Sequence, residues 1–204
     1  MDKRIVKTQK NLKNTLRQMV LEKPFEKISV TEICKRANTS RITFYTYYGD
    51  KYDLLEHCFE DIQEEATERF RELEQDNPDH KLNLSCQHFL MVLIEVTAPF
   101  VHSAAQTEAS PAVTMYYHFI LKNLKMFGKE NADRLKTKYC VEQIDAFLTY
   151  GLWGFIFASG KKNDSAQTVE DAKQLIDDLL ASSIFENLSE KNKTAARGSG
   201  GDDK

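Results

Sequence analysis

Residues 29–51 read SVTEICKRANTSRITFYTYYGDK and predict two short helices joined by a tight turn. Ser29 and Glu32 have the spacing of a capping box, in which the hydroxyl accepts the free amide of the third helical residue while the glutamate reaches back to the cap. Asn38 stands where the chain must turn, because asparagine adopts the left-handed backbone conformation more readily than other residues with a side chain. Ser40 can cap the second helix.

The second helix is expected to have an inward and an outward face. Phe44 and Tyr48 lie about one turn apart and are predicted to face inward. The other surfaces carry polar side chains, and a helix of this kind can enter the major groove of DNA. The predicted DNA-binding residues are the outward-facing side chains of this helix together with nearby polar residues. They are Thr31, Ser40, Arg41, Thr43, Tyr45, Thr46, Tyr47 and Lys51.

The chemistry of these side chains indicates what they contact. Arg41, at the start of the helix, can donate two hydrogen bonds to a guanine, with a phosphate contact as the equal alternative. Thr43 can meet a thymine methyl group or a phosphate, and the hydroxyls of Tyr45 and Tyr47 can donate to phosphates. Lys51 is at a helix N-terminus, which favours a phosphate, so a phosphate contact is predicted for it.

Positive charge is concentrated in the same part of the chain. Residues 1–51 hold 12 Lys or Arg against 5 Asp or Glu, the rest holds 16 against 26, and the net charge of the whole chain is −3. A basic segment of this kind is typical of polyanion binding. A single lysine on a helix surface more often has no role beyond making that surface soluble. The concentration of positive charge in one segment, together with a capped helix pair, favours DNA binding.

Residues 8–55 resemble the DNA-binding domain of the tetracycline-repressor (TetR) family of bacterial regulators. The most specific part is Thr43-Phe44-Tyr45, followed by Tyr48 and Lys51. The resemblance implies a homodimer that binds a palindromic operator as a repressor and is released by a small-molecule effector. The matching segments are PFEKISVTEI (24–33), SRITFYTYY (40–48) and GDKYDLL (49–55).

Composition favours an all-α fold. The chain has 204 residues, 41% of them hydrophobic, with only eight glycines and four prolines, and no segment shows strand-like alternation. About nine helices are predicted, including a linker helix over 51–75, a short helix after Pro99 and a last helix from Thr168. The expected units are a helix-turn-helix domain (1–50), a helical effector-binding and dimerisation domain (51–188), and a disordered tail (189–204) that ends in GSGGDDK, a typical vector-encoded sequence.

Other classes of protein are disfavoured. The sequence has no nucleophile with a base, no metal-ligand cluster and no phosphate-binding glycine loop, so no enzyme, metal or cofactor is predicted. The four cysteines lack metal-site spacing and are predicted to be reduced. The N-terminal helix is too charged for a secretory signal, and the apolar run 146–158 is too short to cross a membrane, which favours a buried core helix. A cytoplasmic protein without membrane contact is expected.

The C-terminal half offers apolar residues for two surfaces. The effector pocket implied by the resemblance is predicted to draw on seven aromatic residues, although a place in the core is the more common role for each: Phe89, Phe100, Tyr116, Tyr117, Phe147, Tyr150 and Trp153. The dimer interface is predicted on the last two helices, from residues with more apolar surface than a monomer should expose: Gly151, Phe155, Leu175, Ile176, Leu179 and Ile184. The alternative is a co-regulator of the same fold whose C-terminal domain binds a partner protein instead of a small ligand.

Overall fold

The structure is a computed structural model that describes residues 3–105, 110–134, 137, 139–160, 165–182 and 184–185. The described part of the chain contains no strand, which confirms the predicted all-α class. Its helices, nine elements in all with the 3-10 helix η1 included, are α1 (Lys3–Glu22), η1 (Phe25–Lys27), α2 (Val30–Arg36), α3 (Arg41–Tyr47), α4 (Lys51–Glu74), α5 (Leu82–Ala105), α6 (Pro111–Glu130), α7 (Val141–Gly160) and α8 (Ser165–Ala181).

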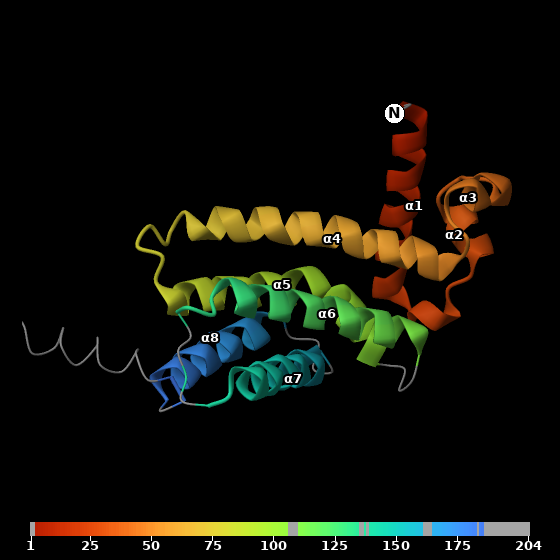
Figure 1. Cartoon of the computed structure of the whole chain (residues 1–204). Helices are drawn as coiled ribbons and strands as arrows, with labels where there is room; N and C mark the ends of the chain where they lie inside the picture. Colours follow the sequence, from red (N-terminus) through yellow and green to blue (C-terminus); the bar gives the residue numbers. More distant parts are fainter. Residues whose placement is uncertain are drawn as a thin grey trace, which may run out of the picture.

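The helices are arranged in layers below a small N-terminal domain (Figure 1). α1 to α3 gather at one end of the long helix α4, and α5 and α6 run beneath α4. α7 and α8 form the layer farthest from α4. α5 is the central helix, because it contacts α1, α4, α6, α7 and α8.

The helix pair has the local signals that the sequence predicted. The amide of Glu32 donates to Ser29 Oγ at 3.2 Å and the amide of Ser29 donates to Glu32 Oε2 at 2.9 Å, so the capping box is confirmed. Asn38 has a φ of 49°, the left-handed conformation expected at the turn. Ser40 Oγ accepts from the amide of Thr43 at 3.0 Å and caps α3.

One hydrophobic cluster connects the N-terminal helices to the last ones. It includes Leu12 of α1, Ile62 of α4 and Phe185, which follows α8. Inside it, the ring of Phe59 lies 5.4 Å from the ring of Phe100 and 5.0 Å from that of Phe119. The predicted boundary at residue 50 falls between α3 and α4, yet buried side chains cross it.

Two expectations about the helices need correction. Pro99 lies inside α5, so the predicted short helix after it is wrong. Proline removes only one backbone donor, and packing of α5 against five other helices holds the helix together. The last helix begins at Ser165 instead of Thr168. The tail from residue 189 lies outside the described residues.

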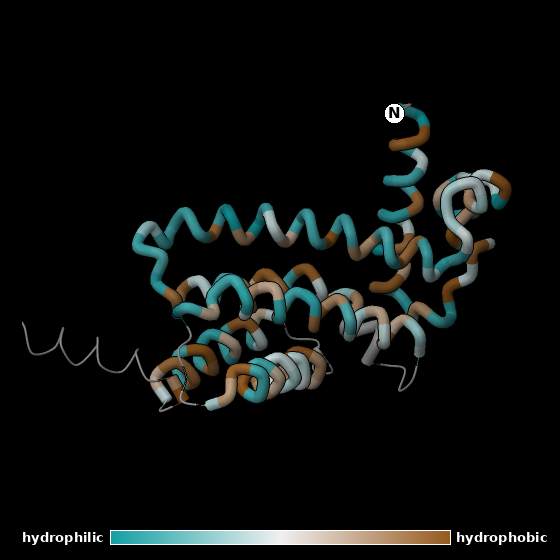
Figure 2. Tube along the Cα trace, viewed as in Figure 1, coloured by the Kyte–Doolittle hydropathy of each residue, from teal (hydrophilic) through white to brown (hydrophobic). Residues whose placement is uncertain are grey.

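α7 is only partly buried, although a buried core helix was predicted for residues 146–158. Phe147 is 61% exposed and Tyr150 is 51% exposed, whereas Ile156 is buried. In Figure 2, α7 is coloured mainly brown to white, with few teal segments. None of the described helices combines the length and the apolar character needed to cross a membrane.

Candidate nucleic-acid interface and ligand cavity

One face of α3 packs against the core, and the other face is exposed. Phe44 and Tyr48 are buried, as predicted, and their rings lie 5.7 Å apart. On the open face, Ile42 is 83% exposed and Tyr45 is 49% exposed. Ile42 was not among the predicted contacts, although an apolar residue between two polar ones on a reading helix is itself a signal for a thymine methyl contact.

Arg41 starts this open face. Its guanidinium carbon lies 5.9 Å from the centre of the Tyr45 ring, close enough for a cation–π contact. Arg41 forms no salt bridge with any described residue. Arg36, in contrast, forms a bidentate salt bridge to Glu22, in which each guanidinium nitrogen lies 2.5 Å from a carboxylate oxygen. Arg41 is therefore placed to contact a base or a phosphate, and Arg36 is held at the surface of its own protomer.

The other predicted DNA contacts differ in their exposure and in whether their hydroxyls already form hydrogen bonds within the protein. Thr46 Oγ1 already donates to the carbonyl of Ile42 at 2.9 Å, so its hydroxyl can only accept a further bond. The hydroxyls of Ser40 and Thr43 lie 2.8 Å apart and share one hydrogen bond. Thr31 is exposed on α2 and Tyr47 is half-buried against the core.

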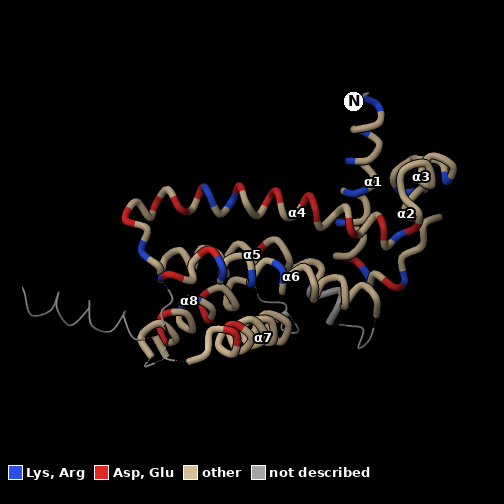
Figure 3. The backbone as a smooth tube through the Cα atoms, in the orientation of Figure 1, with Lys and Arg blue, Asp and Glu red and all other residues tan. Residues whose placement is uncertain are grey.

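Several basic residues of the N-terminal segment are neutralised within the protomer. Lys13 pairs with Asp61 at 2.5 Å, and Arg17 makes two hydrogen bonds to Glu65, which lower the pKa of that carboxyl. In Figure 3, α1 carries blue residues, and the charged residues of α4 are mostly red. The net charge of the segment therefore overstates what is available to a polyanion, and part of it fastens α1 to α4 instead.

Lys51 has a different role from the predicted phosphate contact. Its ammonium group donates to the carbonyls of Phe25, Glu26 and Ile28 at 3.1, 3.1 and 3.0 Å. It also lies 4.6 Å from the ring centre of Phe25 and 5.3 Å from that of Tyr52. Because all three N–H donors are used and the side chain is only 16% exposed, Lys51 fastens η1 to the start of α4.

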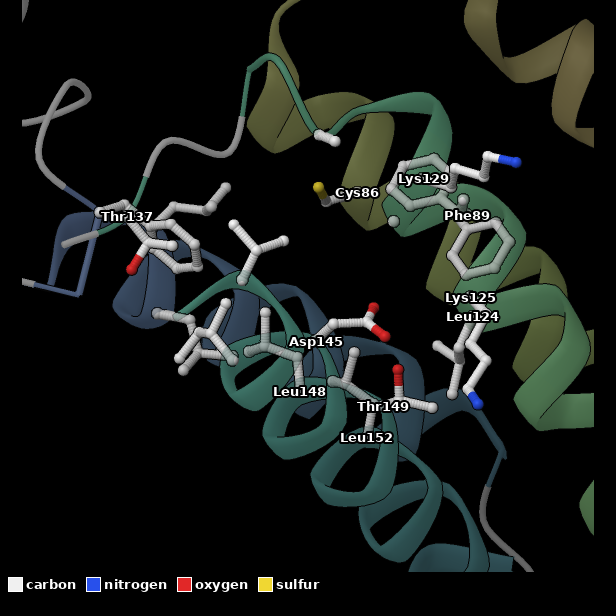
Figure 4. A pocket seen from close by; sticks show the side chains of 18 of the residues that line it. Cys86, Phe89, Leu124, Lys125, Lys129, Thr137, Asp145, Leu148, Thr149 and Leu152 are labelled. Carbon is white, nitrogen blue, oxygen red and sulfur yellow. The ribbon is translucent and has the colours of Figure 1, made fainter. Parts of the chain in front are cut away.

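A cavity of about 890 Å³ lies in the C-terminal domain between α5, α6, α7 and α8 (Figure 4). Its walls are mainly apolar, with Phe89 and Leu90 from α5, Leu148 and Leu152 from α7, and Leu180 from α8. This volume falls within the usual range for small-molecule sites.

A few polar groups interrupt the apolar wall of the cavity. Asp145 and Thr149 project from α7, and Lys125 and Lys129 come from α6. Thr149 is only 3% exposed, and its hydroxyl makes no hydrogen bond to a described residue. The combination of a largely apolar cavity with a few polar groups is typical of a ligand site.

The N-terminal part of the chain is similar to a known family. Residues 14–58 match the model of the bacterial regulatory proteins of the tetR family. This segment contains α2, α3 and the turn between them, and it is similar to the TetR family. No curated protein sequence matches the chain.

Solved structures resemble the chain over most of its length. A TetR-family transcriptional regulator from Syntrophomonas wolfei aligns with a TM-score of 0.68 at 14% identity, over 89% of this chain and 98% of that one. One from Pectobacterium atrosepticum aligns with a TM-score of 0.60 at 17% identity, over 92% and 98%. A protein named dihydroxyacetone kinase operon activator DhaS aligns with a TM-score of 0.53 at 20% identity, over 88% and 98%. At these identities the likeness establishes a shared fold.

Most of the predicted pocket residues lie outside this cavity. Of the seven, only Phe89 lines the cavity. Phe100 and Tyr116 are in the core, and Phe147 faces outward. The remaining three form a separate aromatic group, in which the ring of Tyr117 lies 5.1 Å from that of Trp153 and 6.5 Å from that of Tyr150. The cavity is lined by a different face of α7 from the one that carries Tyr150 and Trp153. The sequence does not show which face turns inward, because the helix is apolar on nearly all sides.

The residues predicted for the dimer interface lie in different environments, on the surface, in the core and in the cavity wall. Gly151 is exposed, and a Cβ atom placed on it would have no neighbour within 4 Å. Ile176 is 6% exposed, so it belongs to the core of the protomer and cannot be a surface contact. Leu179 lines the cavity. Leu175 is half-buried, and Phe155 and Ile184 are partly buried, the last two packed against the core.

Glu26 forms a contact between the two domains that the sequence did not indicate. The hydroxyl of Tyr52 donates to Glu26 Oε2 at 2.7 Å. Ser110 and the amide of Ala112, at the start of α6, lie beside the same carboxylate. Burial raises the pKa of Glu26, but the hydroxyls of Tyr52 and Ser110, the charge of Lys51 and the Ala112 amide outweigh it, so the pKa is lowered.

Proposed function

We propose that this TetR-family protein is a dimeric repressor that binds a palindromic operator and leaves it when a small-molecule effector enters the cavity. The observation that carries the proposal is the placement of α3. Its open face presents Arg41, Ile42 and Tyr45, while buried rings and the Ser40 cap hold it in one orientation. A fixed helix with a basic N-terminal residue is suited to reading base edges in the major groove.

The exposed face of α7 supports a homodimer. Phe147 and Tyr150 present apolar surface there, and Gly151 and Gly154 each have open space where a Cβ would lie. Small residues between large apolar ones allow a second helix to approach closely. A two-fold dimer would then present two α3 helices to half-sites about 34 Å apart, or a multiple of it.

Two connections support coupling between the cavity and the DNA-binding domain. α4 contacts α1 at one side and α5 and α6 at the other, and it begins directly after α3. α6 lines the cavity with Leu124 and Phe127, and its first turn lies beside Glu26 of the DNA-binding domain. A ligand that shifts α6 or α4 therefore acts on the support of α3.

Selection of duplexes from a random pool by the purified protein tests the DNA-binding part of the proposal. We expect a two-fold symmetric consensus, and affinity for it should exceed affinity for scrambled duplex by at least about a thousandfold. Recovery of no consensus would contradict sequence-specific binding. Addition of effector candidates to the complex then tests release, with a typical loss of affinity of about 5- to 150-fold.

Sedimentation tests the dimer. We expect a dimer at micromolar concentration, and Phe147→Asp should shift it to monomer while Met126→Asp does not. Met126 is a matched control because it is also an exposed apolar residue, 46% exposed, but lies on α6. A wild-type monomer would contradict the dimeric repressor.

The alternative is a co-regulator whose C-terminal domain binds a partner protein. The exposed apolar face of α7 also supports this proposal, because such a face fits a partner helix as well as a second copy. A similar fold carries the name of an operon activator, which shows that the fold alone does not require repression. A monomer that binds its consensus only with a partner protein would favour this alternative.

A further inference from the structure

We propose that the cavity binds an apolar molecule that carries a positively charged nitrogen, held between the carboxylate of Asp145 and the ring pair of Phe89 and Phe127. This inference rests on the proposed function, because it names the chemical class of the effector. It is carried by three features of the cavity: an unpaired carboxylate, an aromatic wall opposite it, and the placement of the lysines.

Asp145 is the central polar group of the cavity. It comes from the second turn of α7, and Figure 4 shows its carboxylate directed across the cavity toward α6. A Cβ atom on Gly128 of α6 would lie 3.4 Å from Asp145 Oδ1, so the carboxylate reaches the opposite wall. Asp145 is half-buried and makes no hydrogen bond or ion pair with any described residue. A carboxylate that is partly withdrawn from water without a partner favours a cation beside it.

The wall that faces Asp145 is aromatic. The rings of Phe89 and Phe127 are stacked at 4.2 Å with an interplanar angle of 15°, and both line the cavity. Phe70 meets both rings edge-on, at 6.4 and 6.1 Å, and fixes their orientation. Aromatic faces attract an ammonium group, and a carboxylate on the other side adds a charge-assisted contact. Together these groups provide the chemistry that recognises an amine or a quaternary ammonium.

The basic residues of the lining do not offer an equal site for an anion. Lys125 and Lys129 are both exposed, so water already solvates their ammonium groups. An anionic group deep in the cavity would instead lie near Asp145, which repels it. Asp133 and Glu142 line the cavity as well, and both are exposed like the lysines. The described lining therefore carries three carboxylates against two ammonium groups, and among these five side chains only Asp145 is half-buried.

The test uses three molecules with a ten-carbon chain, decyltrimethylammonium, decanol and decanoate, all at concentrations at which they stay dissolved as monomers. Their affinities for the full chain are measured by calorimetry without DNA. We expect decyltrimethylammonium to bind at least about tenfold more tightly than decanoate. Asp145→Asn should lower its affinity by about tenfold while decanol binds as before. Asp178→Asn, an exposed carboxylate on α8 outside the cavity, is the matched control and should change nothing.

Asp145→Lys provides an independent readout, because it should reverse the preference in favour of decanoate. Tighter binding of decanoate to the wild-type chain, unchanged ammonium affinity in Asp145→Asn, or failure of all three probes to bind would each overturn the inference. A separate titration with the selected duplex distinguishes it from the proposed function. If decyltrimethylammonium binds through Asp145 but leaves DNA affinity unchanged, the ligand class is supported and release by an effector is refuted.

Discussion

Replacement of Lys51 by methionine should destabilise the protein more than it disturbs a contact with DNA. Methionine keeps the apolar stem of the side chain but leaves the carbonyls of Phe25, Glu26 and Ile28 without their shared donor. It also removes the positive charge 3.7 Å from Glu26 Oε2. η1 and the start of α4 then lose the group that joins them.

The magnitude follows from these contacts. A hydrogen bond to a charged group contributes about 1.5–3 kcal/mol, but the three bonds share one ammonium group and water replaces part of them in the variant. Removal of one partner from a buried charged contact costs about 3–5 kcal/mol, and Lys51 is not completely buried. A loss of about 2–4 kcal/mol is therefore expected. With a urea m-value of about 2–3 kcal/mol/M for a chain of this size, the midpoint should fall by about 1–2 M.

Urea denaturation followed by circular dichroism, at one fixed protomer concentration, measures this shift. Lys35→Met is the control, because Lys35 is exposed on α2 and forms no ion pair with a described residue. The control should remain within about 0.5 kcal/mol of the wild type. An unchanged midpoint for Lys51→Met, together with weaker DNA binding and a salt dependence reduced by about 0.9 per lost phosphate contact, would refute the structural role and restore the phosphate contact.

Three further predictions concern the helix pair. Arg41→Ala should weaken binding to the selected duplex by about 1–3 kcal/mol and relax one position per half-site, and an equal loss on scrambled duplex would contradict base reading. Asn38→Ala should lower the free energy of unfolding by about 1–2 kcal/mol because φ is 49°, whereas Asn38→Gly should be tolerated; equal urea midpoints for the two variants would argue against this strain. The Lys23 ammonium and the Ser29 amide and hydroxyl lower the pKa of Glu32 to about 2 from its ordinary 4.5, so its stabilising effect is complete above pH 4.5 and disappears as the pH falls to about 2. Glu32→Gln should therefore be less stable at pH 7 and lose less stability over that interval, as urea midpoints across pH will show.

The sequence predicted best what depends on neighbours in the chain. The capping box of Ser29 and Glu32 and the turn at Asn38 are set by residues three or four positions apart, so their signals are local. The role of Lys51 could not be read in this way. Its carbonyl partners lie more than twenty positions earlier in the chain, and only the packing of η1 on α4 brings them together.

The predicted pocket residues differ from the residues of the cavity for another physical reason. Residues 146–158 are apolar on nearly every side, so periodicity does not show which face of α7 turns inward. The structure turns Leu148 and Leu152 toward the cavity and leaves Phe147 and Tyr150 outside. Asp145, a single charged residue at the edge of this run, was a usable signal, because a charge next to a buried face often marks a site.

The hydrophobic cluster that joins α1 to Phe185 determines how the molecule unfolds. Leu12 and Leu16 of α1 are fully buried, and α1 contacts α4 and α5 as well as α2. Residues 1–50 on their own would expose these side chains. A segment of that size buries too little apolar surface to tolerate this loss. We therefore expect the whole chain to unfold in one cooperative transition. A ligand that binds the folded cavity then raises the melting temperature of the reading helix too, although the two lie at opposite ends of the protein.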